Sequence, residues 1–459
     1  MTVQVAPLVG HAGAVRALAG LLVALGDAGP SARALDAART KALHAIGVTL
    51  AGRELAAVKV AASASASNAG PCTAIGLGAG LSGDAAAFFN GVAGHASLLE
   101  DCGPGGLREG SHPGTYVFPA ALAAAQMANV DAARFLRGLI VGYEAVSRLG
   151  QAAPASIVAR RFRPLGVSGP FGAAAAAAYI MGADAAGMAA ALAISVNSAG
   201  GSTQGIFEGS MEAYFQAGAS ARNGLFAAQL ALAGAVTAEH ALEGEYGFFR
   251  TYAGEDGDLA ALLADRDEAA ICFVGIKRFA SCLQNQQTVA LIVDGLDAPL
   301  SASDIERVII RRPAVGTHGL NSPGVSRSGA QPNRLAAQMS ARFTASAALL
   351  GHPVHDPRFY QDHYADAELL ALTDRVELVP LDSEAIEVDV TFTNGAAPVS
   401  LKGISAELLH PTFDTVRDRM LQRFPPAQTS ALGDIAGIIE TMDAATPITV
   451  LAQALARLS

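Results

Sequence analysis

Tryptophan is absent from the sequence, and both aromatic and charged residues are scarce. Aromatic residues make up 6% and charged residues 16% of the 459 residues, whereas hydrophobic residues make up 51%. Alanine and glycine must therefore fill much of the core, which favours closely packed helices. So little charge leaves little polar surface, and we expect a partner subunit to cover part of it. The length allows two or three domains, or one large domain with an insertion.

The sequence has no long basic run and no paired cysteines. Its formal net charge is −10, whereas nucleic-acid binders normally carry a basic stripe, so we expect no nucleic-acid partner. Cys72, Cys102, Cys272 and Cys282 form no CxxC pair, which excludes a zinc-knuckle or thioredoxin motif, and we expect no metal site. Such sparse cysteines favour a reducing cytoplasm over a disulfide framework.

Long apolar runs are also missing. The first residues lack a charged n-region and include Arg16, which indicates an amphipathic helix rather than a signal peptide. Residues 171–196 are the nearest approach to a membrane span, but a Gly-Ala-Asp turn at 182–184 interrupts them. We therefore expect a buried helix pair, no membrane partner and a cytoplasmic location.

Several catalytic signatures do not occur. There is no GxxxxGK, GxSxG or HExxH sequence, which disfavours phosphate-loop NTPases, α/β-hydrolases and zincins. GAGLSG at residues 78–83 matches the dinucleotide pattern GxGxxG. It lacks the required βαβ context, so a tight turn leading into a helix at Asp84 is the favoured interpretation over a nucleotide site.

The hydrophobic pattern changes twice along the chain. Helical periodicity fills residues 1–268, β-branched alternation appears within 269–404, and helices return in 405–459. The sequence thus predicts a mainly α fold with an inserted α+β domain: a large all-helical domain built from both chain ends and a smaller α+β domain between them.

Individual elements follow from the same periodicity. Strands are predicted at residues 307–311, 375–379, 386–393 and 399–401. Helices are predicted at residues 32–50, 84–98, 119–127, 135–149, 172–181, 186–196, 218–233, 285–296, 334–350, 412–424, 430–442 and 449–457.

The densest polar cluster lies between residues 95 and 112. A helix ends at Glu100 and Asp101, a glycine-rich CGPGG loop follows, and His112 precedes the next helix. Carboxylates facing a histidine suit acid/base chemistry, because each can shift the pKa of the other. The alternative is that the acids cap or salt-bridge and the histidine bonds backbone carbonyls. The loop favours a functional role.

Two further segments concentrate positive charge. ARRFRP at residues 159–164 could clamp carboxylates through its three arginines, although a solvated turn is the favoured interpretation. IKRFASC at residues 276–282 places Lys277 and Arg278 at the start of the predicted insertion. Clefts between domains are common ligand sites, whereas a single lysine is most often a surface residue.

Taken in order, several segments resemble the 2-methylcitrate dehydratase (MmgE/PrpD) family over nearly the whole chain. DAAAFFNGVAGHASLLEDC is similar to its NG-x-x-x-H helix with an acidic end, and SHPGTYVFPAALAAAQ to its His-Pro-Gly segment. LIVGYEAVSRLG, GPFGAAAAAAYIMGAD, GASARNGLFAAQLALAGA and LEGEYGFF follow in the family's order. No single segment is decisive, but the ordered set is specific.

The resemblance implies a homodimer in which an active site lies between the helical domain and an α+β lid. It implies activity on small polycarboxylic acids without an obligatory organic cofactor. Known activities in the family are 2-methylcitrate dehydration, cis-aconitate decarboxylation and iminodisuccinate epimerisation. All of them form or quench a carbanion-like centre next to a carboxylate.

By position, the resemblance makes Asp101, His112 and Lys277 the expected catalytic residues. The expected substrate-binding residues are His95, Glu100, Cys102, Arg163, Glu212, Gln216 and Cys282. The sequence departs from the family pattern at six positions, which indicates a different substrate: Cys102 replaces threonine, Arg163 and Gln286 each replace a histidine, Glu212 and Gln216 stand in place of a lysine-x-x-His segment, and Phe343 replaces tyrosine.

These residues suggest a lyase that abstracts a proton next to a carboxylate. His112 is the expected base or acid, with an ordinary pKa of about 6.5, and Asp101 would orient it. Lys277 and Arg163 would stabilise the enolate in a water-poor site. Two alternatives stay open, an epimerase or racemase of a dicarboxylic acid and a non-catalytic carboxylate binder.

Overall fold

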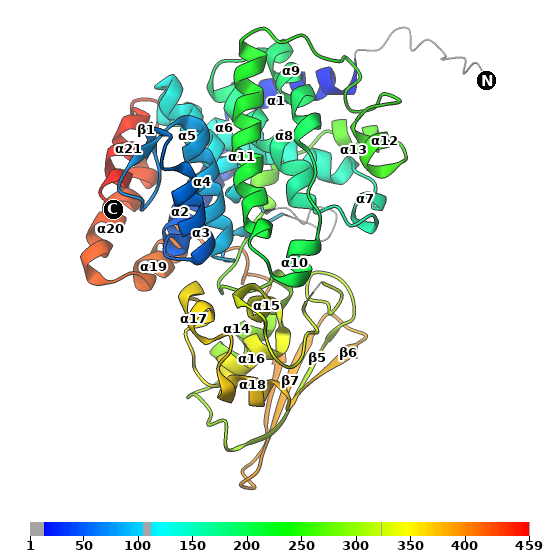
Figure 1. Cartoon of the computed structure of the whole chain (residues 1–459), viewed down its shortest axis with the longest axis vertical. Helices are drawn as coiled ribbons and strands as arrows, with labels where there is room; N and C mark the ends of the chain where they lie inside the picture. The colour runs from blue at the N-terminus through cyan, green and yellow to red at the C-terminus, as the bar shows by residue number, and fades with distance from the viewer. Residues whose placement is uncertain (1–12, 104–111, 323, 459) are drawn as a thin grey trace, which may run out of the picture.

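The computed structural model describes residues 13–103, 112–322 and 324–458. A large helical region lies above a smaller region that contains a β-sheet (Figure 1). Most of the predicted glycine-rich loop, residues 104–111, lies outside the described residues. The structure confirms the predicted fold class, a mainly helical protein with an α+β part.

The helical region uses both parts of the chain that flank the sheet region (Figure 1). Its N-terminal helices are α1 (Ala14–Asp27), α2 (Ala32–Gly52), α3 (Ala56–Ser65), α4 (Gly83–Ala96), α5 (Val117–Ala128), α6 (Ala132–Ala152), α7 (Ser156–Ala159), α8 (Pro164–Ile180), α9 (Ala185–Ser195), α10 (Gln204–Glu208), α11 (Glu212–Leu232), α12 (Phe248–Ala253) and α13 (Leu259–Leu263). The C-terminal helices are α19 (Phe413–Arg423), α20 (Pro426–Thr441) and α21 (Ile448–Ala456).

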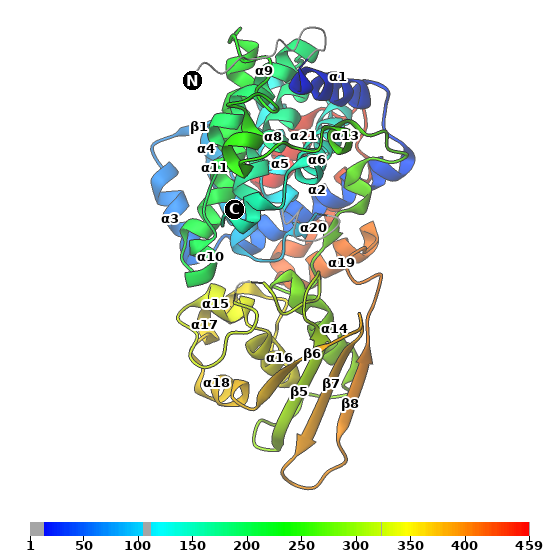
Figure 2. The ribbon, with the colours of Figure 1, turned by 90° about the vertical axis from the view of Figure 1, so that its right-hand side faces the viewer.

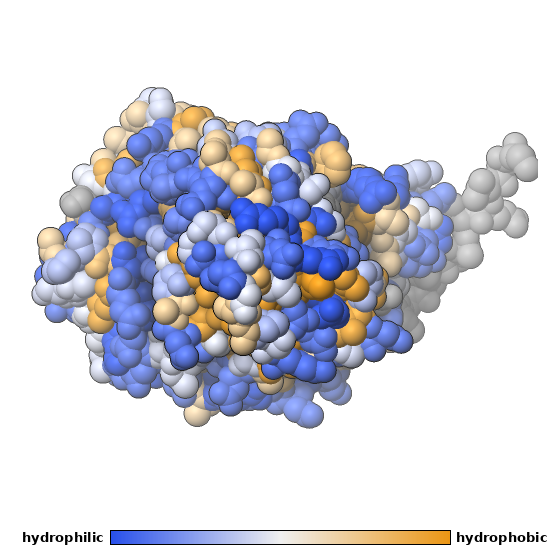
Figure 3. Space-filling model, turned by 90° about the horizontal axis from the view of Figure 1, so that it is seen from below, coloured by the Kyte–Doolittle hydropathy of each residue, from blue (hydrophilic) through white to orange (hydrophobic). Residues whose placement is uncertain are grey.

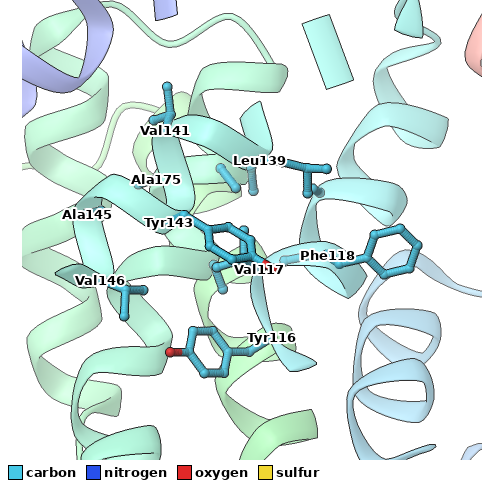
Figure 4. Packing of buried hydrophobic residues seen from close by; sticks show 14 of the residues in the cluster. Tyr116, Val117, Phe118, Leu139, Val141, Tyr143, Ala145, Val146 and Ala175 are labelled. Atoms are coloured by element: carbon cyan, nitrogen blue, oxygen red, sulfur yellow. The ribbon is translucent and has the colours of Figure 1, made fainter. Parts of the chain in front are cut away.

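Small residues allow the central helices to approach closely. Helix α8 packs against α6 and α11, and α11 packs against α4. A Cβ atom added at Gly224 of α11 would lie 2.4 Å from the Cβ of Ala173 on α8, so only glycine fits there. The few aromatic side chains, such as Tyr116, Phe118 and Tyr143, are surrounded by aliphatic ones (Figure 4). Alanine and glycine therefore do fill much of the core, as the composition predicts.

Two local predictions are confirmed in this region. Helices α8 and α9 form the predicted pair: Gly182 takes a left-handed φ of 91° at the turn, and the Asp184 side chain accepts a hydrogen bond from Gly187 N. Strand β1 (Ala69–Thr73) pairs antiparallel with β2 (Gly80–Leu81), and Ser82 then caps α4. The GAGLSG segment is thus a turn into a helix and not a dinucleotide loop.

The sheet region contains the predicted strands. They are β5 (Ile305–Pro313), β6 (Val376–Leu381), β7 (Ile386–Phe392) and β8 (Val399–Gly403), in the order β6-β5-β7-β8. Strands β5 and β6 run parallel, whereas the other two pairs are antiparallel. The helices of the region are α14 (Gln286–Gly295), α15 (Arg334–Met339), α16 (Ala341–Leu349), α17 (Pro357–His363) and α18 (Ala367–Thr373).

The two faces of this sheet differ in chemistry. Alternate residues such as Val308, Ile310 and Val388 are buried, and α14 and α16 pack against the sheet on one side (Figure 2). The intervening residues form ion pairs, including Arg311–Asp389 and Lys402–Glu387. Seen from below, this end of the molecule is mostly hydrophilic, with apolar residues scattered between (Figure 3).

The prediction of one helix over residues 334–350 is wrong, and α8 and α11 begin eight and six residues before their predicted starts at 172 and 218. Residues 334–350 form two helices, α15 and α16, instead of one. The break falls at Ser340, whose backbone is extended and whose Oγ accepts a hydrogen bond from Phe343 N at 3.2 Å. A serine that caps a new helix therefore outweighs the continuous apolar periodicity. Within the described residues, no helix combines the length and apolar character needed to cross a membrane.

Candidate active site

A short strand pair joins the helical region to the start of the sheet region. Strand β3 (Asp101–Cys102) pairs antiparallel with β4 (Gly275–Ile276), so that Asp101 lies opposite Ile276. This pairing brings Glu100, at the end of the α4 segment, next to Lys277, which is 177 positions further along the chain. The structure thus places together the carboxylate cluster and the boundary lysine that the sequence singles out.

Glu100 is the centre of the cluster. Its Oε1 accepts a hydrogen bond from Lys277 Nζ at 2.8 Å and lies 3.5 Å from the Nδ1 atoms of both His95 and His112. Its Oε2 is buried and has no hydrogen-bond partner among the described residues. Burial alone would raise the pKa of Glu100, but Lys277, His112 and His95 together lower it well below its ordinary value. Glu100 is therefore ionised and balances the lysine.

His112 is the most exposed side chain that contacts Glu100. The exposed fraction of its side chain is 18%, against 1–2% for those of Glu100, His95 and Lys277. His112 Nδ1 lies 2.7 Å from the backbone oxygen of Asp101. A carbonyl oxygen only accepts, so Nδ1 carries the proton and Nε2 is the unprotonated nitrogen of the neutral ring.

The pKa of His112 differs from the sequence-based expectation. Burial lowers it to about 3, with Glu100 opposing this and Lys277 adding to it. This is well below the unperturbed value of about 6.5 that motivated the choice of His112, because burial disfavours the charged ring and Lys277 repels it. At neutral pH His112 is therefore uncharged and can accept a proton. A pKa this low also makes the ring a weak base, so the Glu100 carboxylate must stabilise the imidazolium that forms.

Asp101 fixes the segment that carries His112. Its carboxylate accepts hydrogen bonds from Tyr143 Oη at 2.6 Å and from Gly114 N at 2.9 Å. A Cβ atom at Gly114 would lie 2.9 Å from Asp101 Oδ2, which explains the glycine of the His-Pro-Gly segment. Burial raises the pKa of Asp101 to about 6 despite these bonds. Both carboxylate oxygens are occupied, so the geometry supports a positioning role.

His95 and Arg163 form the other side of the cluster. Arg163 Nη2 lies 2.6 Å from His95 Nε2. A guanidinium only donates, so His95 Nε2 accepts, and its Nδ1 proton points toward Glu100. Burial lowers the pKa of His95 to about 4 and that of Arg163 to about 10. His95 therefore connects the arginine to the carboxylate.

Of the remaining expected binding residues, Gln216 contacts the cluster, whereas Cys102, Cys282 and Glu212 make no hydrogen bond with it. Gln216 Oε1 accepts a hydrogen bond from Arg163 Nη1 at 3.3 Å, and so borders the cluster. Cys102 is buried in β3, where burial raises its pKa to about 12. Cys282 is buried as well, and its thiol donates to Gln284 Oε1 at 2.7 Å. Glu212 is exposed and makes no hydrogen bond or ion pair with this cluster.

Arg160 and Arg161 do not form the arginine clamp considered from the sequence. Both are exposed, and Arg160 donates to the backbone oxygen of Tyr252 at 2.7 Å. Of the arginines in the segment 159–164, Arg163 alone contacts the cluster. The favoured interpretation of a solvated turn therefore holds for Arg160 and Arg161.

Two departures from the family pattern have structural roles. Gln286 is fully buried, and its Oε1 accepts hydrogen bonds from the backbone N atoms of Arg278 and Phe279, at 3.0 Å each. It thereby holds the turn that follows Lys277. Phe343 lies in the core between the sheet and its helices, 6.1 Å from the ring of Tyr360.

Several cluster residues were missed by sequence reasoning. Tyr214 lies edge-on to His95 at 5.9 Å, and the Arg334 guanidinium lies 5.0 Å from the Tyr214 ring. Tyr143 lies in LIVGYEAVSRLG, a segment of the family resemblance, but nothing in the sequence gave it a role in the site, and Tyr214 could not be distinguished from a core residue. Lys41 gave a clearer signal, because it directly precedes residues 42–52, which contain no Asp, Glu, Lys or Arg. Burial lowers its pKa to about 8, and Asp101 opposes this.

The part of the chain that the structure describes contains no group of three or more His, Cys, Asp or Glu side chains that could hold a metal ion. The side chains that surround Glu100 instead offer a neutral imidazole base, a buried ammonium and a buried guanidinium. Such a set can bind an anion and remove a proton from it.

Comparison with known proteins identifies the family. Residues 16–259, more than half of the chain, match the MmgE/PrpD N-terminal domain. The chain belongs to the MmgE/PrpD family. The match includes His95, Glu100, His112 and Arg163, whereas Lys277 lies beyond it. In the structure, the pairing of β3 with β4 brings Lys277 next to Glu100.

One curated protein is similar to this chain over part of its length. The chain is 32% identical over 190 residues to the cis-aconitate decarboxylase-like protein oryM of Aspergillus oryzae (strain ATCC 42149 / RIB 40). The alignment covers 40% of this chain and 39% of that protein. The matched part is thus well under two thirds of the relative's own length.

Proposed function

We propose that this protein is a lyase that acts on a small polycarboxylic acid by removing a proton next to a carboxylate. The observation that carries the proposal is the 2.7 Å contact between His112 Nδ1 and the backbone oxygen of Asp101, which assigns the tautomer of His112. Its Nδ1 proton is bound by the Asp101 carbonyl, and its Nε2 is left as a base at the most exposed edge of the cluster. Membership of the MmgE/PrpD family and a relative named as decarboxylase-like support a reaction of this kind.

The neighbouring cations suit the charge that such a reaction develops. Loss of the α-proton leaves an electron pair that spreads into the adjacent carboxylate as an enolate. Lys277 and Arg163 would stabilise that charge from a buried position, where electrostatic interactions are stronger than in water. Glu100 keeps Lys277 in place before substrate binds and balances its charge. The electron pair then forms a double bond to the neighbouring carbon as the bond from that carbon to its hydroxyl group breaks, and the proton taken by His112 leaves with the hydroxide as water.

The direct experiment combines a substrate panel with a variant of the base. The purified protein is assayed on hydroxy-, amino- and unsaturated polycarboxylic acids. His112→Gln should lower turnover of any active substrate by at least about a hundredfold, the scale of one acid/base group. His363→Gln, on an exposed histidine of α17, is the matched control and should keep wild-type turnover. Wild-type turnover in His112→Gln would contradict the proposal.

Deuterated water separates the lyase from the alternatives. A lyase gives elimination or decarboxylation product, whereas an epimerase or racemase incorporates deuterium at the α-carbon without net elimination. A non-catalytic binder is stabilised against thermal unfolding by di- and tricarboxylates and gives neither product nor exchange. Either of the last two outcomes would replace the lyase proposal.

A further inference from the structure

A cavity lies beside the turn that follows Lys277. Its volume is about 440 Å³, within the range of small-molecule sites. It is bounded by Arg278 and Phe279, by the end of α14, by residues 351–355 and by one face of α19. Helix α19 belongs to the helical region, so the cavity is shared between the two regions (Figure 2).

Two arginines of α19 line this cavity without partners. Arg419 and Arg423 are one helical turn apart and both line the cavity. Among the described residues neither forms a hydrogen bond or ion pair, although Asp294 acts on Arg419 and Asp356 on Arg423 through longer-range electrostatics. Arg419 Nη1 and Arg423 Nε are buried nitrogen atoms with no acceptor. Arg417, on the same helix, is instead paired with Asp414 and Asp418. Buried guanidinium donors normally have partners, so these two side chains are suited to bind an anion.

The charges around the cavity do not balance. Arg278, which adds a third guanidinium, is paired with Asp294. Asp297 also lines the cavity, while Asp356, whose charge acts on Arg423, is engaged by Arg358 at 2.7 Å.

Burial and the neighbouring arginines both lower the pKa values of the basic groups that face the cavity. Burial lowers the pKa of Arg423 to about 10, Asp356 opposes the shift and Arg419 adds to it. Burial likewise lowers the pKa of His355, and Arg423 adds to that shift. The histidines His352 and His355 are therefore neutral at pH 7, and the two unpaired arginines dominate the cavity.

We propose that this cavity binds a small polyanion with phosphate- or carboxylate-type oxygens, at a site distinct from the one around His112. Planar guanidinium forks suit such oxygens, and two forks one turn apart can hold two anionic groups or two edges of one group. The bound anion would join α19 to the turn at Arg278.

The test is binding of inorganic phosphate and of citrate to the full-length protein. Calorimetry and thermal unfolding are measured at pH 7.5 and constant ionic strength, with sodium chloride as the reference salt. The variants are Arg419→Gln with Arg423→Gln, the control Arg417→Gln on the same helix, and Lys277→Met in the other site. The two probes distinguish a phosphate site from a polycarboxylate site.

The proposal predicts that at least one probe stabilises the wild-type protein beyond chloride. The double variant should bind that probe at least about a hundredfold more weakly, since each charge-assisted contact contributes about tenfold or more. Arg417→Gln and Lys277→Met should keep the binding. Arg423→Lys, which retains the charge without the fork, should fall between the wild type and the double variant.

Three results would overturn the proposal. They are stabilisation no greater than that by chloride, unchanged affinity in the double variant, and loss of binding in Lys277→Met with retention in the double variant. The last result would place the anion in the site around His112. If the double variant does not fold, the single variants Arg419→Gln and Arg423→Lys decide, and unchanged affinity in both would end the proposal.

Discussion

Oppositely charged side chains meet in two very different surroundings in this protein. Lys277 Nζ lies 2.8 Å from Glu100 Oε1, with exposed side-chain fractions of 2% and 1%. On the outer face of the sheet, Lys402 Nζ lies 2.7 Å from Glu387 Oε1, with fractions of 69% and 23%. The two contacts are alike in geometry and differ in solvent access.

The difference teaches what an ion pair does in each place. Exposed pairs contribute about 0–1 kcal/mol, because water and salt screen them. A buried pair adds little net stability either, but removing one partner leaves an uncompensated charge and costs about 3–5 kcal/mol. The outer face of the sheet thus favours solubility and strand register, whereas the Glu100 cluster holds a charged group ready for an anionic ligand.

Removing the lysine from each pair should give the largest contrast. We expect Lys277→Met to lower the free energy of unfolding by about 3–5 kcal/mol and turnover by at least about a hundredfold. Lys402→Met, the matched control, should change the free energy by less than about 1 kcal/mol and leave turnover unchanged. Urea unfolding and initial-rate assays measure both quantities. Equal losses of unfolding free energy and turnover in Lys277→Met and Lys402→Met would contradict the claim that the buried and the exposed ion pair differ in role.

Acidification should affect the buried histidines strongly. Burial lowers the pKa of His44 to about 3, that of His95 to about 4 and that of His112 to about 3. In the unfolded chain histidine titrates near 6.5, so between pH 6.5 and about 4 the unfolded state binds more protons. Stability is therefore lost as pH falls through this window, by up to about 1.4 kcal/mol per pH unit for each histidine.

Asp101 opposes this trend. Its pKa is raised to about 6, so between about pH 4 and 6 the folded state binds more protons at this group than the unfolded state does. Urea unfolding from pH 4.5 to 7 tests the balance. His44→Gln should reduce the slope of the unfolding free energy against pH by up to about 1.4 kcal/mol per pH unit, which corresponds to one proton fewer taken up on unfolding. An unchanged slope would show that His44 is not held neutral.

A smaller effect is expected from the close contact at Gly114. Gly114→Ala places a methyl group 2.9 Å from Asp101 Oδ2, which must displace the carboxylate or the His112 segment. We expect a loss of about 1–3 kcal/mol in stability, the range for overpacking, together with lower turnover. Gly433→Ala, with nothing within 4 Å of the added Cβ, is the control. Wild-type turnover in Gly114→Ala would contradict the inference that Asp101 positions the His112 segment.

The smallest effect should come from the outer face of the sheet. Arg311→Gln removes contacts with Asp389 and Glu387. The three side chains are partly exposed, and we expect a change of less than about 1 kcal/mol with no change in turnover. Thermal unfolding at low and high salt checks this. A larger loss would show that this face is less solvated than its chemistry indicates.

Much of the fold was predictable from periodicity. The predicted strands all occur, and so does the long helix α2, because apolar spacing and flanking turn residues agree there. The break at Ser340 was not predictable, since a serine is compatible with either a helix interior or a cap. The homodimer and the proposed domain boundaries stay predictions.

Some residues of the cluster around Glu100 could be named from the sequence, but their arrangement could not, and their catalytic roles stay predictions. Polar residues beside a glycine-rich loop indicated Glu100 and His112, and the family resemblance indicated Lys277. The sequence could not show that Glu100 lies between three positive or titratable groups, because this depends on the pairing of β3 with β4. Nor could it give the lowered pKa of His112, which depends on burial.

The central claim is that Glu100 and Lys277 form one buried unit that joins the two regions. A double-mutant cycle with Glu100→Gln, Lys277→Met and both together, read from the free energy of unfolding, tests it most directly. We predict a coupling free energy of at least about 2 kcal/mol, because either single change leaves a buried charge that the double change removes. Additivity within about 0.5 kcal/mol would contradict the account.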